Sequence, residues 1–456
     1  MDKQELRKNR LMNEPMKTLI PAMAVPTIIS FLITTIYNLA DTYFVSFLGT
    51  NATAAVSVNA SIDQVIMMVG SLFAIGANSY AARLIGAQQE KKASQVLSTA
   101  FFLAGVFGLL VLILGISFMK PLVHLLGATE NCEQYAIDYA TYVLLVAPFM
   151  ACNFVMNQCL RAEGSAMLSM IGMSFGGILN CILDPIFIFT FDLGVAGASM
   201  ATAISKLVSF AILIYPYLTK KSLLRLSAKL IHMSKDIISQ IIMVGSSSFF
   251  RNVLALVAAV ILNNLAGQIS ESVLAAIGVT NRVMMLPFGV VLGFGAGFQP
   301  VAGFNWGAKN YDRVQESYRF ASRTAFLGSC LMAAVFIIFS KQLISLFTAT
   351  DEELMRIGSY CIIVQSIALP VHAWCAVVNM YCAGLGFAKS AFIMATARQG
   401  SCFLPIVYPM AYFFGTMGIA SVMAVADLLT IFLAIPIIRR AQRTVRAAAL
   451  ENSTAI

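Results

Sequence analysis

The 456-residue sequence is poor in charge: only 11% of its residues are Asp, Glu, Lys or Arg, whereas a soluble domain has about 25%. It has three histidines, His124, His232 and His372, which leave little material for a catalytic triad or a metal centre. It contains no Walker lysine loop, no G-x-S-x-G and no H-E-x-x-H motif. These absences argue against a soluble protein, an enzyme and an ATP-driven pump, so any transport would have to be driven by an ion gradient.

The nine cysteines never occur in C-x-x-C spacing, so the sequence signals neither a zinc site nor a redox motif. Most of them lie within apolar segments, and we interpret them as small hydrophobic residues. A cleavable signal peptide is not recognisable, because residues 1–17 are charged and the apolar segment that follows has no small-residue cleavage site.

Long apolar segments are what the chain has in abundance. Hydrophobic residues make up 59% of it, and its mean hydropathy is +0.82. A membrane-spanning helix needs about 20 mainly apolar residues. We predict twelve such helices, at residues 18–47, 53–81, 94–119, 134–160, 165–190, 196–218, 237–264, 272–303, 320–340, 354–382, 388–412 and 417–438. The sequence is therefore that of an all-α polytopic membrane protein.

Lys and Arg are distributed unequally between the two sides of this arrangement. Both tails and every second loop together hold 23 of the 30, the other side holds three, and four lie within spans. Such a bias marks cytoplasmic loops, so we expect a multi-pass protein of the cell inner (plasma) membrane with both termini in the cytoplasm. The net charge of +9 then suits an anionic inner leaflet and needs no nucleic acid partner.

The two halves of the chain resemble each other. Residues 73–88 match residues 294–309, where both spans end in Gly-Ala before a basic loop, and residues 157–164 match 379–386 at nearly the same offset. We predict an N-terminal six-helix bundle at 1–218 and a C-terminal bundle at 237–456, related by a pseudo-twofold axis. Transporters are often built in this way, whereas a receptor would not need two matched halves.

A basic linker at residues 219–236 joins the two halves. Its mixture of apolar and basic residues favours a short helix lying on the membrane surface. It is the longest basic connection of the chain and stands at its midpoint.

Acidic residues inside membrane spans are the strongest functional signal, since each costs about 2.5–3.5 kcal/mol at a helix centre. Asp41 and Asp184 lie at similar depths in the first and fifth predicted spans, near their outer ends. Asn180 is one turn from Asp184, on the same helix face. Tyr139 and Thr202 start near the outer ends of spans four and six. We predict that these five side chains meet in the N-terminal bundle.

Such a cluster has a definite chemistry. Two carboxylates in a low-dielectric site cannot both ionise cheaply, so one is expected to hold a proton and to release it when water or a cation arrives. The surrounding oxygens also suit a hard cation such as sodium. We expect no cofactor, and no metal beyond a sodium ion at this cluster. The alternative is a packed polar network that only fixes the helix register.

Other embedded charges leave alternatives open. Asp63 either supports the Asp41 cluster or lies near an outer opening. Asp427 shares the second half with Arg251, Arg282 and Arg398, which either neutralise it in a structural ion pair or line a water-filled cavity. We favour the cavity, because one acid cannot neutralise three arginines.

Methionine and phenylalanine are abundant, with 24 and 32 residues. Met is unbranched and polarisable and recurs on promiscuous binding surfaces. These residues suit a deformable apolar wall, and Met173, Met284 and Met285 are candidates to line it.

The combination of motifs resembles a known family. Twelve spans in two repeats, Tyr37-Asn-x-x-Asp41 in span one, Asn180-x-x-x-Asp184-Pro in span five and the Gly-Ala ends of spans two and eight resemble the multidrug and toxic compound extrusion (MATE) family, in particular its bacterial multidrug efflux branch. The resemblance covers nearly the whole chain. It implies a V-shaped pair of bundles around a central cleft, and cation-coupled export of amphipathic, often cationic, compounds.

The resemblance also implies sites. The family's N-lobe cation site would fall on Asp41, Asn180, Asp184 and Thr202. Another branch of the family carries acidic residues in spans seven and ten, where this chain has Arg251 and His372, so a second cation site is not expected. The residues that we expect to line the substrate cleft are Tyr37, Asn38, Asn153, Asn157, Met173, Met284, Arg251 and Asp427.

We therefore expect a secondary antiporter that functions as a monomer and exports small amphipathic molecules in exchange for protons or sodium ions. The alternative is a lipid-linked saccharide flippase of the same superfamily. The three embedded arginines favour the flippase, and the acidic cluster of the N-terminal half opposes it.

Overall fold

The computed structural model describes residues 3–347 and 351–454, and every regular element within these ranges is a helix. The helices of the first half are α1 (Lys3–Asn13), α2 (Met16–Ser46), α3 (Thr50–Gly86), α4 (Glu90–Ser117), α5 (Met119–Leu125), α6 (Glu133–Leu145), α7 (Ala147–Ala162), α8 (Ala166–Pro185), the π-helical turn η1 (Ile186–Thr190) and α9 (Gly194–Leu218). Those of the second half are η2 (Ala228–Leu230), α10 (Lys235–Ile269), α11 (Glu271–Gly307), α12 (Tyr311–Ile338), α13 (Ser340–Ser345), α14 (Glu352–Leu385), α15 (Ala388–Thr396), η3 (Ala397–Ser401) and α16 (Leu404–Thr454).

Twelve spans can be counted among the described residues. Ten helical runs are long and apolar enough to cross a membrane, and α6 with α7, bent by 50° at their junction, make an eleventh. The last run, Ala388–Ser453, has 66 residues and would be about 100 Å long as one helix. It contains two spans, because Gly415 has the non-helical angles φ 52° and ψ −130°, and Gly418 lies against the carbonyl of Met410. The predicted number of spans is confirmed.

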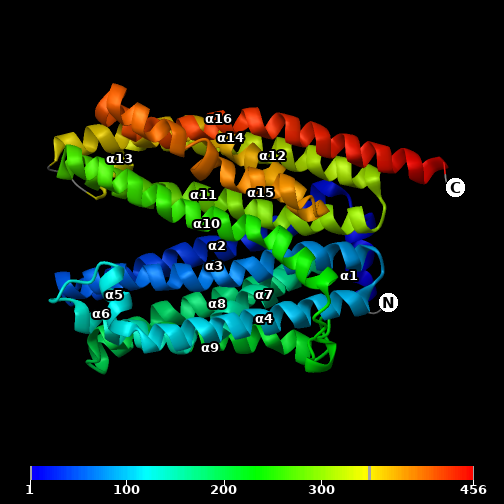
Figure 1. Ribbon diagram of the computed structural model, residues 1–456, viewed down its shortest axis with the longest axis horizontal. Helices are drawn as coiled ribbons and strands as arrows, with labels where there is room; N and C mark the ends of the chain where they lie inside the picture. The colour runs from blue at the N-terminus through cyan, green and yellow to red at the C-terminus, as the bar shows by residue number, and fades with distance from the viewer. Residues whose placement is uncertain (1–2, 348–350, 455–456) are drawn as a thin grey trace.

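The last helix of the chain extends further than predicted. The twelfth span was expected to end at residue 438, but α16 continues to Thr454, and Figure 1 shows this end projecting beyond the bundle. The extension is rich in Arg and Ala, which are strong helix formers. Helix α1 was not expected at all.

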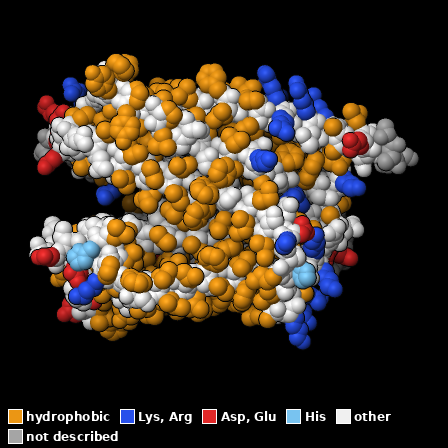
Figure 2. Space-filling view, in the orientation of Figure 1, with side chains coloured by type: hydrophobic (Ala, Val, Ile, Leu, Met, Phe, Trp, Pro, Cys, Tyr) orange, Lys and Arg blue, Asp and Glu red, His pale blue; other side chains and the backbone are white. Residues whose placement is uncertain are grey.

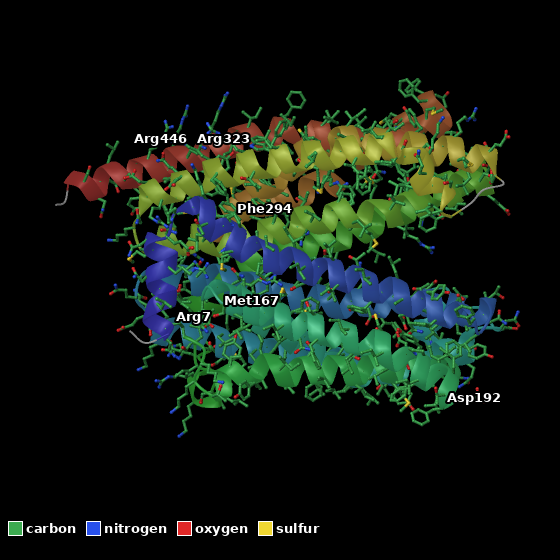
Figure 3. The ribbon with its side chains drawn as sticks, turned by 180° about the vertical axis from the view of Figure 1, so that it is seen from behind. Arg7, Met167, Asp192, Phe294, Arg323 and Arg446 are labelled. Carbon is green, nitrogen blue, oxygen red and sulfur yellow. The ribbon has the colours of Figure 1, made fainter. Side chains whose placement is uncertain are left out.

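Two bundles lie side by side, and both termini are at the same end of the molecule (Figure 1). Helices α2 to α9 form one bundle and α10 to α16 the other. Lys and Arg side chains gather at the end with the termini, which we call the basic end (Figure 2). At the opposite end the surface is hollowed between the bundles. Arg7, Arg323 and Arg446 lie toward the basic end and Asp192 at the other (Figure 3).

The two bundles touch through close backbone approaches at glycine. Gly76 of α3 lies against the backbone of Ile241 in α10, and Gly297 of α11 lies against the backbone of Ala24 in α2. Gly76 and Gly297 occupy matching positions of the internal repeat. Because glycine has no Cβ, it lets two membrane helices approach closely, and the paired contacts follow the pseudo-twofold relation of the halves.

The linker does not form the expected surface helix; its one helical piece is the three-residue 3₁₀ turn η2. Side chains of the N-terminal bundle accept hydrogen bonds from the linker N–H groups that would otherwise form a helix. Glu163 accepts from Leu223 N at 2.8 Å, and Ser94 Oγ accepts from Arg225 N at 3.0 Å. Leu223 and Leu224 are buried, so the linker is fastened to the N-terminal bundle.

Helix α1 crosses the basic end and contacts both halves (Figure 3). Arg7 donates to the carbonyl of Lys221 in the linker at 3.0 Å. Arg313 of α12 donates to the carbonyl of Glu14, the residue directly after α1, at 2.7 Å. Leu11 is buried, so α1 is packed against the protein as well as hydrogen-bonded to it.

Candidate functional site

Polar side chains from four helices form a cluster inside the N-terminal bundle. Asp41 of α2 accepts a hydrogen bond from the Tyr139 hydroxyl of α6 at 2.9 Å. Asn180 of α8 donates to Asp184 Oδ1 at 3.0 Å and to Thr202 Oγ1 of α9 at 3.2 Å. Asp41 and Asp184 are near enough for their charges to interact. The structure thus brings together all five residues that the depth argument grouped, and all five are buried.

The cluster is short of hydrogen-bond donors. Three of its buried oxygens, Asp41 Oδ1, Asn180 Oδ1 and Asp184 Oδ2, and the neighbouring Asp63 Oδ1 have no partner among the described residues. Buried polar atoms nearly always have a partner, and each of these four atoms is an acceptor. Protons or a hard cation would satisfy them, so the donor set fits an exchangeable cation of either kind.

Two further charged groups belong to this region. Asp63 of α3 interacts electrostatically with Asp41 and with Lys206 of α9, so of its two interpretations the structure favours the one beside the cluster. Lys206 donates to the Tyr37 hydroxyl at 2.6 Å, and its ammonium lies 4.6 Å from the centre of the Tyr37 ring. In the sequence, Lys206 is one of the four basic residues that lie within predicted spans, and nothing else marks it. Its position one helical turn after Thr202 was the signal that could have found it.

Local sequence explains how these helices meet. Gly177 of α8 lies against Tyr37 of α2, and Gly176 lies against Ser209 of α9, so the three helices approach closely where the small residues are. Directly after Asp184 and Pro185, α8 passes into the π-helical turn η1. Proline lacks an N–H and disturbs the helical ladder, and π-turns of this kind are frequent at functional sites.

The two asparagines of α7 that we expected in the substrate cleft are buried and hydrogen-bonded to backbone. Asn153 donates to the carbonyl of Lys206 and Asn157 to the carbonyl of Ser169, each at 3.1 Å. They join α7 to α9 and α8, so in this conformation both amides hold helices together.

Four other residues that were expected to line the cleft differ in how far they are exposed. Asn38 is exposed, and Tyr37 and Met173 are partly exposed. Met284 is completely buried, so it presents no surface to a cleft in this conformation. A sequence pattern identifies an adaptable methionine but not the direction in which its side chain points.

The C-terminal bundle holds a second polar cluster. Asp427 Oδ1 of α16 contacts His372 Nδ1 of α14 at 3.0 Å and Arg398 Nε of η3 at 2.8 Å. The sequence favoured a water-filled cavity over an ion pair for the embedded arginines, and for Arg398 the structure shows the ion pair. Arg251 donates instead to a serine of its own helix at 2.9 Å, and Arg282 is exposed.

Comparisons with known proteins agree with this architecture. The MatE family model matches residues 26–186 and 247–413, one segment in each half, beginning at the offset of the internal repeat. The multidrug export protein MepA of Staphylococcus saprophyticus is 28% identical over 405 residues, which are 89% of each chain. MepA of Staphylococcus aureus is 28% identical over 406 residues, again 89% of each chain.

Solved structures resemble the whole fold. One is the outward-facing conformation of a multidrug resistance MATE family transporter of the MOP superfamily, with a TM-score of 0.90 and 25% identity over 96% of this chain and 98% of that one. Another is a MOP superfamily transporter from Pyrococcus furiosus, described as having a binding pocket of reverse polarity, with a TM-score of 0.89 and 25% identity over the same shares. With a family match in both halves and the same twelve-span fold, the chain belongs to the multidrug and toxic compound extrusion (MATE) family.

Proposed function

We propose that this multi-pass membrane protein is a secondary antiporter that exports small amphipathic compounds, cations among them, in exchange for protons or sodium ions. Multidrug efflux follows from its relatives, which are named multidrug export proteins, and from its fold. The comparisons do not favour a flippase. The observation that carries the ion exchange is the set of four buried acceptor oxygens that lack donors.

The proposed orientation puts the basic end in the cytoplasm of the cell, because Lys and Arg mark cytoplasmic loops. The hollow between the bundles (Figure 2) then opens outward. The contacts at Gly76 and Gly297 close the path between the bundles. Residues 1–218 and 237–456 would be the two moving lobes of a functional monomer, with 219–236 as their link.

The proposed cycle begins when a cation from outside reaches the N-terminal cluster. A proton or a sodium ion at the unpartnered oxygens relieves the repulsion between Asp41 and Asp184. Helix α2 then shifts, since Pro26 inside it leaves one backbone carbonyl without its helical donor. The shift removes the substrate site and completes the exchange.

Ethidium efflux from proteoliposomes tests this proposal, with a pH gradient imposed in one set and a sodium gradient in the other. Efflux under one gradient alone identifies the coupling ion. We expect Asp41→Asn and Asp184→Asn to lose coupled efflux while both variants still insert and purify like the wild type. Asp351→Asn, outside the spans at the start of α14, is the matched control. Full coupled efflux in both cluster variants would show that the mechanism is wrong.

A further inference from the structure

One charged group of the N-terminal bundle has no part in this exchange. The Lys206 side chain lies against Tyr37, which it contacts through both the hydroxyl and the ring face. Asn153, another residue expected in the cleft, holds the Lys206 backbone carbonyl. Lys206 itself is partly exposed. A positive charge therefore stands among the residues that are expected to receive the substrate.

The groups that face the ammonium come from two other helices. Tyr37 of α2 supplies the hydroxyl and the ring, and the charge of Asp63 of α3 acts on the ammonium without a direct ion pair between the two. The neighbouring acids Asp41 and Asp184 bind the exchanged ion in the proposed cycle. Lys206 thus places a positive charge of the chain itself next to the acids that bind the exchanged ion.

An aromatic face such as that of Tyr37 is an environment in which proteins bind organic cations. Here the chain's own ammonium already occupies it. A lysine ammonium is a compact charge on a flexible stem, so it can turn away from Tyr37, but a monocation arriving there meets a like charge. A substrate that carries a carboxylate as well as an amine meets an opposite charge instead.

We propose that Lys206 sets the charge selectivity of the N-terminal bundle: it disfavours amphipathic monocations and favours amphipathic zwitterions whose acidic group pairs with its ammonium. This inference rests on the proposed export function and deepens it. It assigns to Lys206 a substrate contact rather than a role in ion exchange.

A pair of dyes that differ at one group tests the inference in proteoliposomes. Rhodamine B has a free carboxylate and is a zwitterion, and its methyl ester is a permanent monocation with the same ring system. The wild type should export the free acid with a lower KM than the ester. Lys206→Met should lower the KM for the ester about tenfold or more, because a like charge held against a ligand costs at least that much, and should raise the KM for the free acid.

The controls separate charge from folding. Lys206→Arg keeps the charge and should keep the preference for the free acid. Lys389→Met removes an exposed lysine of α15 outside the cleft and should behave as the wild type. Lys206→Gln removes the charge but keeps a hydrogen-bond donor toward the Tyr37 hydroxyl, and it should prefer the ester as Lys206→Met does.

The outcomes distinguish the two proposals. If the wild type exports both dyes and neither Lys206→Met nor Lys206→Gln changes the ratio of their KM values, the role of Lys206 is wrong and the antiporter stands. If the wild type exports neither dye nor ethidium under either gradient, both proposals are wrong.

Discussion

The Tyr139 hydroxyl donates a hydrogen bond of 2.9 Å to Asp41 across 98 residues of sequence. It satisfies one carboxylate oxygen and leaves the other without a partner. Tyr139 therefore holds Asp41 in place while keeping an acceptor free for an exchanged proton or cation. The same division occurs at Asp184, where Asn180 occupies one oxygen and the other is unpartnered.

Tyr139→Phe should slow export without preventing insertion. The buried carboxylate of Asp41 loses its donor, and an unsatisfied buried group costs about 1–3 kcal/mol. The measurement is the initial rate of ethidium efflux by Tyr139→Phe. The control is Tyr135→Phe, at the exposed start of α6. Equal rates for the two variants would mean that the hydroxyl of Tyr139 has no role in exchange.

The ion pair of Asp427 and Arg398 should be revealed by a double-variant cycle. Removing one partner leaves a buried charge alone, at about 3–5 kcal/mol, whereas removing both is often nearly neutral. Arg398→Met should lower the thermal unfolding midpoint in detergent, and Arg398→Met with Asp427→Asn should recover most of the loss. Additive losses would contradict the pairing.

The close approach of the bundles at Gly297 should not tolerate a methyl group. Gly297→Ala places the new Cβ against the backbone of Ala24 in the other bundle, and overpacking of this kind costs about 1–3 kcal/mol. Gly289→Ala, on the same helix with open space around it, is the control. The difference between their unfolding midpoints tests the contact, and no difference would show that the bundles separate freely here.

Glu163 should control how firmly the linker is held. Burial raises the pKa of Glu163, while the hydrogen bonds from Ser222 and Ser165 and the charge of Arg7 act in the opposite direction. With a raised folded pKa, its contribution to the attachment is fully present in acid and is lost as the pH rises through that pKa.

Trypsin cleavage at the exposed linker residues Lys221, Arg225 and Lys229 measures this attachment. The cleavage rate of the wild type relative to that of Glu163→Gln should rise with pH, because the amide does not titrate. A ratio that is independent of pH would show that Glu163 does not govern the linker.

The sequence by itself determined the number of spans, the separation of a basic end and the repeat. These are local properties, since about 20 apolar residues make a span in any fold and the bias of Lys and Arg is read from the loops. It also grouped Asp41, Tyr139, Asn180, Asp184 and Thr202, because depth along a span follows from counting residues.

Depth, however, leaves the rotation of each helix about its axis undetermined, and only packing sets it. For that reason the tertiary structure alone decided that Lys206 meets Tyr37 across 169 residues, that Arg398 pairs with Asp427, and that Met284 points into the interior. It also decided the form of the linker, since the side chains that take its N–H groups, Glu163 and Ser94 among them, come from distant parts of the chain.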